Sequence, residues 1–428
     1  MSLSTQSKRI GTCAALGTFA LLLALNMLNY IDRYILPGEQ PLIQREFHAS
    51  DQQMGALTTA FFFTYMIVAP LSGWLGDWLR RKPLIVVGAT IWSLATLASA
   101  FAHSYESLFL RRALVGVGEA TFGIFAPAVL ADFYPDRERN RILSVFYLAI
   151  PVGAALGYLA GGEMGTLWGW RAPFLICALP GLAVALLYMA FGREPERGAY
   201  DLPDLETTSG SDHDALGDFF ERFFALLKNP AFLTSTFGLA QITFALGGIS
   251  AWVPTFLHRV NGLTVANASL VVSAITVIDG IAGTIVGGWI AHRWQRTEHR
   301  ALYFVSFWSA ALALPFGVLV FFGPRSTTIP ALFAAEFFIF LNTGPLNAAI
   351  VNSVNGAIRA TAISVNLFCI HFFGDTFSPQ IIGAISDRTT LSIGLGATLV
   401  SLVIASLVLW YGARFAPPLM EPVSEPAR

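Results

Sequence analysis

Apolar and polar positions alternate along the chain in long blocks. Apolar runs of about 18 residues or more recur twelve times, and a helix of that length crosses the hydrocarbon core of a bilayer. Six runs precede a polar stretch at 192–230 and six follow it. We therefore predict an all-α membrane protein with twelve transmembrane helices in two six-helix bundles, at 1–191 and 231–428. The predicted spans are 12–36, 52–76, 84–102, 106–131, 142–162, 171–191, 231–256, 267–291, 301–322, 328–350, 360–384 and 392–413.

The polar stretch at 192–230 predicts a cytoplasmic linker that contains one short helix. Its first part, REPERGAYDLPDLETTSGSDHD, is acidic and poor in apolar residues, which is typical of disorder. The following ALGDFFERFFALLKNP brings apolar side chains to one face, so we predict an amphipathic helix on the membrane surface. The alternative is that this segment merely extends the next span. The apolar face consists of Leu216, Phe219, Phe220, Phe223 and Leu227.

The composition supports lipid as the solvent of this surface. The 428 residues are 55% hydrophobic and 12% charged, about half the charged fraction of a soluble domain. The formal net charge of −1 gives no basic field that would attract nucleic acid. Cys13, Cys177 and Cys369 lie far apart in apolar runs, so we expect neither a disulfide framework nor a metal cluster. The first run lacks a small-residue cleavage site after it, so we interpret it as an uncleaved span.

The basic residues indicate how the chain is oriented in the membrane. Cytoplasmic loops of membrane proteins carry an excess of Lys and Arg. If the N-terminus is cytoplasmic, 18 of the 26 Lys and Arg residues fall on the cytoplasmic side. We therefore expect both termini to lie in the cytoplasm.

A loop that recurs in both halves gives the first resemblance to a known family. GWLGDWLRRK closes the second span and GWIAHRWQRTEHR closes the eighth, which is the second span of its half. Gly73, Asp77, Arg81 and Lys82 resemble the loop between helices two and three of the major facilitator superfamily. The second copy has His292 where the family pattern has Asp.

This resemblance implies a cytoplasmic gate. Asp77 would lie near the start of the eleventh helix, where the helix dipole attracts an anion. Arg81 would pair with Asp132 at the end of the fourth span, and together these residues would hold the cytoplasmic side shut. We expect Gly73 to let two helices approach closely. The alternative is that Asp77 and the basic residues only set the topology.

Four acids fall well inside predicted spans: Glu119, Asp279, Glu336 and Asp375. A charge in the middle of a bilayer costs about 2.5–3.5 kcal/mol on insertion scales. Each of these acids must therefore face a cavity, find a partner or be protonated. No motif supports Asp279 or Glu336, so direct coupling and a structural role both remain open for them.

The first and fourth spans carry the strongest candidate site. NYIDRY places Asp32 and Arg33 near the outer end of the first span, at a depth similar to that of Arg112 in RRALVGVGEATFG. Arg112 and Glu119 share a helix face but lie about 10.5 Å apart along the axis, too far to pair. We expect Asp32 to neutralise Arg112, and Glu119, between burial and a guanidinium, to carry a proton. The alternative is that Asp32 and Arg33 merely end the helix at the interface.

The eleventh span predicts a jointed helix that carries an acid. In CIHFFGDTFSPQIIGAISDR, His371 and Asp375 are four residues apart and share a face. Pro379 removes a backbone hydrogen bond, and Gly374 and Gly383 loosen the helix, which suits a moving wall. The alternative is that Asp375 simply pairs with His371 or a serine.

Taken together, these stretches resemble spinster-type transporters. NYIDRY, RALVGVGEA, AWVPTFL and HFFGDTFSPQIIGAISDR occur in order across both halves. The resemblance implies alternating access between two bundles, with lysophospholipids or sphingoid-base phosphates as substrates and protons as the coupling ion. The residues expected to bind substrate are Arg33, Arg112, Glu119, Thr121, Phe122, His371 and Asp375. Those expected to couple protons are Asp32, Arg112 and Glu119.

We therefore predict a proton-coupled secondary transporter of an amphiphilic anion. We expect it to act as a monomer in the bacterial inner membrane, with no cofactor besides the coupling proton. The alternatives keep the fold but change the cargo to a small organic anion, such as a sugar phosphate or carboxylate, or to drugs for export. A membrane enzyme is less well supported, because the sequence has no Gly-x-Ser-x-Gly, His-Glu-x-x-His or Walker motif.

Overall fold

Helices form almost all of the structure, a computed structural model that describes residues 12–195, 215–355 and 358–418. The linker predicted as disordered falls mostly outside these residues. The first half contains α1 (Thr12–Phe47), α2 (Asp51–Trp78), α3 (Arg81–Ser99), α4 (Tyr105–Phe133), α5 (Asp136–Tyr147), α6 (Ala149–Leu159), the π-helix η1 (Ala160–Met164), α7 (Gly165–Trp168) and α8 (Arg171–Phe191). The second contains α9 (Ala215–Leu227), α10 (Pro230–Arg259), α11 (Val265–Gln295), α12 (Ala301–Phe322), η2 (Arg325–Thr327), α13 (Thr328–Phe340), α14 (Thr343–Asn352), α15 (Arg359–Ile370), η4 (His371–Asp375), α16 (Ser378–Arg388), α17 (Leu391–Gly412) and η5 (Ala413–Phe415).

The membrane spans agree with the fold class predicted from the sequence. Eleven helical stretches within the described ranges are long and apolar enough to cross a membrane. The remaining predicted span, the eleventh (360–384), corresponds to α15, η4 and α16, which are separated by a break at Gly374 (φ −111°, ψ −109°). The prediction of an all-α membrane protein is therefore confirmed, and the predicted joint in the eleventh span is present at Gly374.

Helix α1 is longer than the predicted first span. It continues through Pro37 and Pro41 to Phe47, eleven residues past the predicted end. Prolines are tolerated in membrane helices because neighbouring groups can satisfy the backbone atoms that they disturb. Here the Ser269 hydroxyl of α11 donates to the Gly38 carbonyl (2.7 Å). The placement of Asp32 near the outer end of the helix is thus wrong, because Asp32 lies well inside α1.

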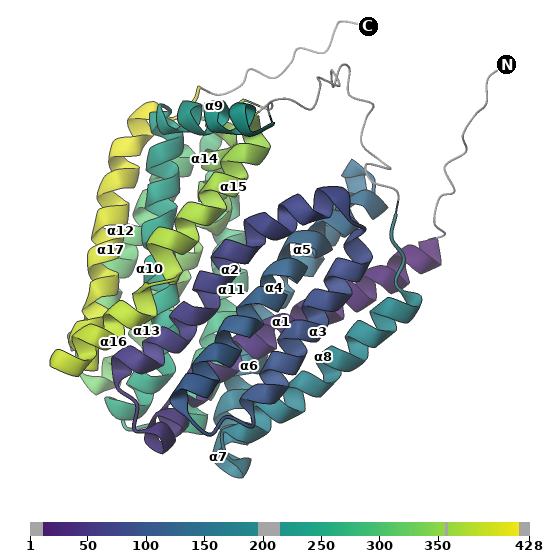
Figure 1. The fold of residues 1–428 in the computed structure, drawn as a ribbon. Coiled ribbons are helices and arrows are strands. Elements are labelled where there is room, and N and C mark those ends of the chain that lie inside the picture. Colours follow the sequence, from purple (N-terminus) through teal and green to yellow (C-terminus); the bar gives the residue numbers. More distant parts are fainter. Residues whose placement is uncertain (1–11, 196–214, 356–357, 419–428) are drawn as a thin grey trace, which may run out of the picture.

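The predicted amphipathic helix is present as α9. The alternative, an extension of the next span, is wrong because Asn229 separates the two helices. Its side chain caps α10 by accepting hydrogen bonds from the backbone amides of Ala231 (3.0 Å) and Phe232 (3.1 Å). Leu226 is buried, so α9 packs against the C-terminal bundle, and Figure 1 shows it lying across the end of that bundle. The contact predicted between the apolar face of α9 and the membrane surface stays a prediction.

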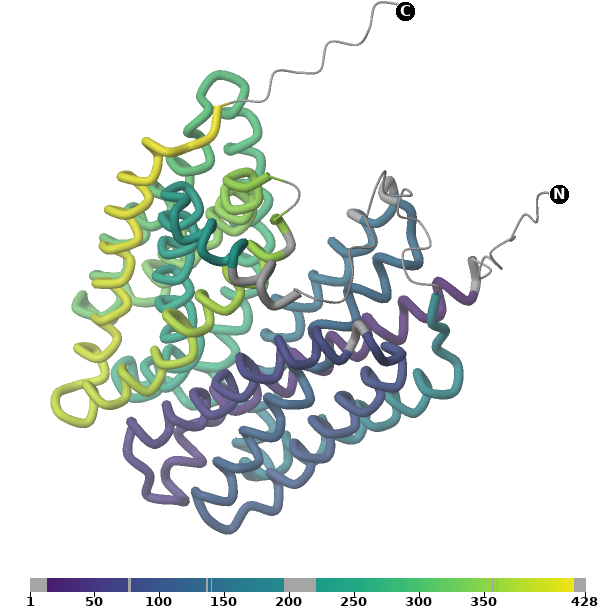
Figure 2. The backbone as a smooth tube through the Cα atoms, turned by 45° about the horizontal axis from the view of Figure 1, so that its top comes forward, coloured from purple at the N-terminus to yellow at the C-terminus, as the bar shows by residue number. Residues whose placement is uncertain are grey.

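Two bundles lie side by side, α1–α8 in the N-terminal bundle and α10–η5 in the C-terminal bundle (Figures 1 and 2). They meet at one end, where α2 packs on α16, and α1 and α6 pack on α11. Towards the other end, which holds the start of α1 and helix α9, the ribbons of the two bundles diverge. We call these the closed end and the terminal end.

Candidate functional site

A buried ion pair joins α1 to α4 at the centre of the N-terminal bundle. The Arg33 Nη2 and Nε atoms both donate to Glu119 Oε2, at 2.9 and 3.1 Å. The Glu119 side chain is fully buried and that of Arg33 is 15% exposed. The Arg33 guanidinium carbon also lies 4.8–5.8 Å from four aromatic ring centres, in cation–π range. These rings, which we call the aromatic box, belong to Tyr30, Phe61, Phe62 and Tyr65.

Asp32 and Arg112 lie beside this pair without forming one of their own. Both are buried, and neither oxygen of Asp32 makes a hydrogen bond. Arg112 has no partner at Nε or Nη1 and lies 5.3 Å from the Phe61 ring centre. Asp32 and Arg112 thus form no direct ion pair, although the two side chains lie within electrostatic range of each other. The predicted neutralisation across the site stays a prediction, and Arg33 is the direct partner of Glu119. Sequence spacing gives the faces of one helix but not which of two adjacent residues turns toward a neighbouring helix.

Glycines on α4 let neighbouring helices approach the site. A Cβ atom on Gly116 would lie 2.3 Å from the Phe61 carbonyl oxygen of α2. A Cβ atom on Gly118 would lie 2.5 Å from the backbone of both Gly88 and Trp92 in α3. Since no side chain fits at either position, α2 and α3 both pack directly against the turn of α4 that precedes Glu119.

The C-terminal bundle contributes His371 and Asp375 to the same region. Asp375 Oδ1 lies 2.9 Å from His371 Nδ1, so the pairing stated as the alternative to a functional role for Asp375 is present. The His371 ring stacks on Phe62 (5.8 Å between ring centres) and meets Tyr65 edge-on (5.5 Å). Both rings belong to the aromatic box, so His371 faces the Arg33 site across the interface between the bundles.

The two residues Thr121 and Phe122, which follow Glu119 closely, occupy different surroundings. The Thr121 hydroxyl donates to the Val117 carbonyl (3.0 Å) and lies 3.3 Å from Ser72 Oγ of α2. Phe122 is buried between Trp92 and Phe146 in the core of the N-terminal bundle. The structure therefore places Phe122 in the core of the N-terminal bundle and does not bring it to the ion pair.

Asp279 and Glu336 form a second acidic region, in the C-terminal bundle. Both side chains are buried, and neither Asp279 oxygen has a hydrogen-bond partner. Glu336 lies within electrostatic range of Asp279 and of Tyr34 and Tyr158 from the N-terminal bundle. No Lys or Arg of the described chain forms an ion pair with either acid.

Sequence reasoning missed a further buried acid, Glu39 of α1. It is fully buried, and neither of its oxygens makes a hydrogen bond. The predicted first span ends at residue 36, just before Pro37 and Gly38, and so leaves this acid outside the membrane. A usable signal was present, since Asp32, Glu39 and Glu46 recur at intervals of seven residues.

The predicted gate residues at the terminal end stay within the N-terminal bundle. Arg81 Nη1 pairs with Asp132 Oδ2 at 2.5 Å, the contact expected from the sequence, and it joins α3 to α4. Lys82 lies in the first turn of α3, and the side chain of Asp77 falls outside the described part of the structure. A Cβ atom on Gly73 would meet nothing within 4 Å, so the expected close helix approach is absent in this conformation.

A polar network that sequence reasoning missed joins the bundles at the closed end. Arg259 of α10 donates to both carboxylate oxygens of Asp51 (2.8 and 2.9 Å) and to Gln44. Ser386 donates to Asp51 as well (2.5 Å). The Asp387 carboxylate accepts from the first amides of α2, where the helix dipole favours an anion.

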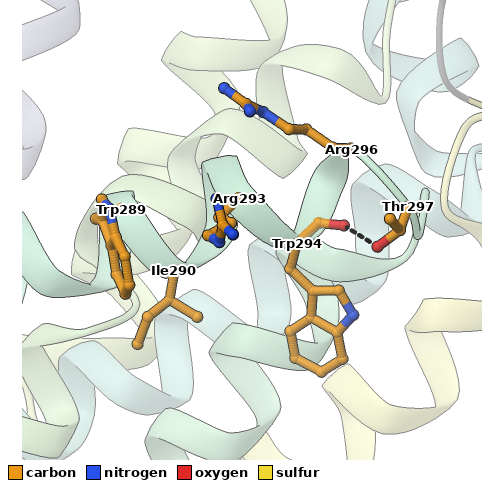
Figure 3. Close-up of a pocket in the computed structure, with 6 residues that line it drawn as sticks. All are labelled: Trp289, Ile290, Arg293, Trp294, Arg296 and Thr297. Atoms are coloured by element: carbon orange, nitrogen blue, oxygen red, sulfur yellow. Dashed lines mark hydrogen bonds between the residues drawn. The ribbon is translucent and has the colours of Figure 1, made fainter.

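A surface depression of about 590 Å³ lies elsewhere, in the last turns of α11. Figure 3 shows its residues, with the Thr297 hydroxyl donating to the Trp294 carbonyl (3.1 Å). None of the buried charged side chains described above lines this depression. The lining residues are Trp289, Ile290, Arg293, Trp294, Arg296 and Thr297.

Two bundles of membrane helices that enclose buried charged side chains indicate a membrane transporter. Comparison with known proteins supports this class. Residues 22–379 match the model of the Major Facilitator Superfamily. Protein spinster homolog 1 is 36% identical in Xenopus laevis (86% of this chain, 72% of that protein) and 34% identical in Homo sapiens (86% and 72%). The sphingosine-1-phosphate transporter SPNS2 of Danio rerio is 32% identical (85% and 74%).

Solved structures agree on the fold. A bacterial homologue of the human lysosomal transporter spinster, in an inward-facing and unoccupied conformation, superimposes with a TM-score of 0.83 at 23% identity. The match covers 95% of this chain and 98% of that one. The chain belongs to the Major Facilitator Superfamily and, within it, to the spinster family of transporters.

Proposed function

We propose that this spinster-type transporter couples the movement of an amphiphilic anion to protons by alternating access. One observation carries the proposal: the Arg33–Glu119 pair is buried in an aromatic box beside an unpartnered acid and an unpartnered base. Buried charges are costly unless they are paired, so the unused donors and acceptors of this site favour the binding of another charged group.

The coupling uses competition for Arg33. When Glu119 is ionised, it holds Arg33 through two charge-assisted hydrogen bonds. When Glu119 takes a proton, this attraction weakens and Arg33 becomes available to an anionic head group. The two unpartnered donors of Arg112 supply further contacts for that group. In the substrate-bound state, an ionised Asp32 balances the positive charge that the head group leaves on the two arginines. In the state without substrate, Asp32 can instead hold the proton.

The surroundings of the ions suit a molecule with a charged head and an apolar tail. The aromatic box offers an apolar surface next to the guanidinium, and His371 and Asp375 approach it from the other bundle. A relative of this chain is named for sphingosine-1-phosphate, which has a phosphate head and a long hydrocarbon chain. Thr121 adds a hydroxyl on the same helix as Glu119.

We take the terminal end to face the cytoplasm of a bacterial cell, in line with the excess of Lys and Arg in the loops on that side. In this orientation the closed end is extracellular, and the conformation described here faces inward. The bacterial spinster homologue that superimposes on this chain also adopts an inward-facing conformation. We expect a monomer to be the transporting unit.

A transport assay tests the proposal. The purified protein is reconstituted in liposomes, and uptake of labelled sphingosine-1-phosphate, a lysophospholipid and glucose-6-phosphate is measured with and without a pH gradient. One pH unit is worth about 1.4 kcal/mol per proton, so accumulation of an amphiphile should change about tenfold. Uptake that does not depend on the pH gradient would contradict proton coupling. Preferential uptake of glucose-6-phosphate would favour the alternative of a small-anion transporter.

A further inference from the structure

Three acids follow one face of α1 at intervals of seven residues: Asp32, Glu39 and Glu46. Seven residues make about two helical turns, so successive carboxyl groups are about 10.5 Å apart along the axis. Glu46 lies near the closed end with 42% of its side chain exposed. Glu39 and Asp32 are fully buried. The three acids therefore form a series from the surface to the central ion pair, which we call the acid ladder.

Helix α8 covers the acid ladder along its length. At the surface, Glu46 pairs with Arg171 (2.7 Å) and accepts a hydrogen bond from the Trp170 indole (2.6 Å). Six residues further along α8, Cys177 lies within electrostatic range of both Glu39 and Asp32. The ladder is thus enclosed within the N-terminal bundle, and the interface between the bundles does not interrupt it.

Unpartnered polar atoms from α3 gather at the inner end of the ladder. Trp92 Nε1, Ser93 Oγ and Thr96 Oγ1 are all buried and make no hydrogen bond. Trp92 and Thr96 neighbour Asp32, while Ser93 faces Gly181 of α8, where a Cβ atom would lie 2.4 Å from its hydroxyl. Buried polar groups are nearly always paired, with bound water when no protein group is in reach. These atoms are suited to hold water molecules between the acids.

Glu39 occupies a space made by two glycines of the opposite wall. A Cβ atom on Gly165 would lie 2.6 Å from Glu39 Oε2, and one on Gly161 would lie 3.3 Å from its backbone nitrogen. Gly161 belongs to the π-helical segment η1, a feature that occurs frequently at functional sites. An ionised carboxylate without a hydrogen-bond donor is costly in such a place, so Glu39 is suited to hold and release a proton.

We propose that the acid ladder is a proton path through the N-terminal bundle, from the closed end to the central ion pair. A proton taken up at Glu46 passes through water to Glu39, and from Glu39 through water to Asp32. At each step one O–H bond breaks and one forms, and water is the only co-reactant. The path rests on the proposed proton coupling. It gives protons access to the centre while the network of Asp51 and Arg259 keeps the bundles joined.

Other ionisable groups near the ladder set its charge balance. Arg171 and His103 act on Glu46, and Arg112 and Glu119 of α4 act on Asp32. On α8, the thiol of Cys177 interacts electrostatically with both buried acids, Asp32 and Glu39. Glu163, which lies on η1, has no assigned place in the ladder and serves as the matched control.

The test compares proton movement with substrate exchange in liposomes. The full chain is reconstituted with a trapped pH-sensitive dye, labelled sphingosine-1-phosphate is added outside, and the initial rate of internal acidification is recorded. Glu39→Gln should slow acidification about tenfold or more, because the amide keeps the shape but cannot relay a proton. Glu46→Gln should slow it less, because Glu46 is partly exposed and bulk water can deliver protons at its position. Glu163→Gln should match the unmodified protein.

Substrate counterflow at equal pH reports whether a variant folds and moves substrate. It should persist in Glu39→Gln, because exchange needs no net proton transfer. If Glu39→Gln also loses counterflow, Glu39→Asp decides, since it keeps an acid and should restore acidification. Failure of Glu39→Asp as well would make Glu39 a packing residue and overturn the path.

The remaining outcomes separate this path from the proposed function. Acidification by the unmodified protein together with unchanged acidification in Glu39→Gln would overturn the path and leave proton coupling intact. If the unmodified protein transports substrate without any acidification, proton coupling itself is wrong and the path is overturned with it.

Discussion

The two ends of the interface between the bundles differ in how they are held. At the closed end, Asp51 meets Arg259 and Ser386, and Asp387 caps the start of α2. Two further hydroxyls donate to backbone carbonyls across the same interface, Tyr158 to Ser250 (2.7 Å) and Ser273 to Ala155 (2.8 Å). At the terminal end, the described ion pair of Arg81 with Asp132 lies within one bundle.

The glycines show the same difference. A Cβ atom on Gly55 would lie 2.3 Å from the Pro379 carbonyl oxygen, and one on Gly383 would lie 2.3 Å from the Asp51 carbonyl oxygen. At the terminal end, Gly73 and Gly288 have no atom within 4 Å of such a Cβ. Packing therefore requires glycine at positions 55 and 383 of the closed end in this conformation. At the terminal end, Gly73 and Gly288 have no such contacts, so they are available for close helix packing in the opposite conformation.

The largest effect is expected from a side chain that prevents the closed end from closing. Gly55→Val would clash with the Pro379 carbonyl, and overpacking of this kind costs about 1–3 kcal/mol. If this cost of about 3 kcal/mol falls only on the state with the closed end shut, the population of that state drops about 100-fold relative to the other state. Transport in liposomes should therefore nearly stop. Gly17→Val, at a site with nothing within 4 Å, is the control. Equal transport by the two variants would contradict the comparison.

A smaller effect is expected when the closed end loses its ion pair but keeps its packing. Asp51→Asn removes the charge that Arg259 binds, and hydrogen bonds to charged groups contribute about 1.5–3 kcal/mol each. The population of the state described here should fall about tenfold. Spin labels on Trp78→Cys and Trp289→Cys at the terminal end should then report shorter distances. An unchanged distance distribution would mean that the ion pair does not hold this state.

The smallest effect is expected at the terminal end. Gly73→Ala meets no neighbour in this conformation, and alanine favours a helix by about 1 kcal/mol over glycine. The melting temperature should therefore stay the same or rise slightly, while transport falls about two- to threefold as close packing in the other state is impaired. A lower melting temperature would show that Gly73 is already packed here.

The fold could be predicted from the sequence because lipid imposes a simple rule. Long apolar runs mark spans, and the twelve-span pattern is confirmed even where α15 and α16 break at Gly374. The same rule failed at the end of α1, where Pro37 and Pro41 resemble a stop signal. In a helix supported by its neighbours they are tolerated, and that error hid Glu39.

The site was predicted in its parts but not in its pairing. Helical spacing found the contact of His371 with Asp375, and the family resemblance found that of Arg81 with Asp132. Neither could decide that Arg33 turns toward Glu119, because the rotation of α1 against α4 depends on packing by residues far apart in the chain. The Asp51–Arg259 network was missed for a similar reason, since its members lie near helix ends, where charged residues are common.

In the proposed mechanism, the Arg33–Glu119 pair links proton binding to substrate binding. Glu119→Gln imitates a permanently protonated acid and tests this claim most directly in liposomes, where uptake and counterflow of labelled sphingosine-1-phosphate are compared at several pH values. Glu119→Gln should keep counterflow but lose pH-driven accumulation, by about tenfold per pH unit of gradient. Accumulation that follows the pH gradient as in the unmodified protein would contradict this mechanism.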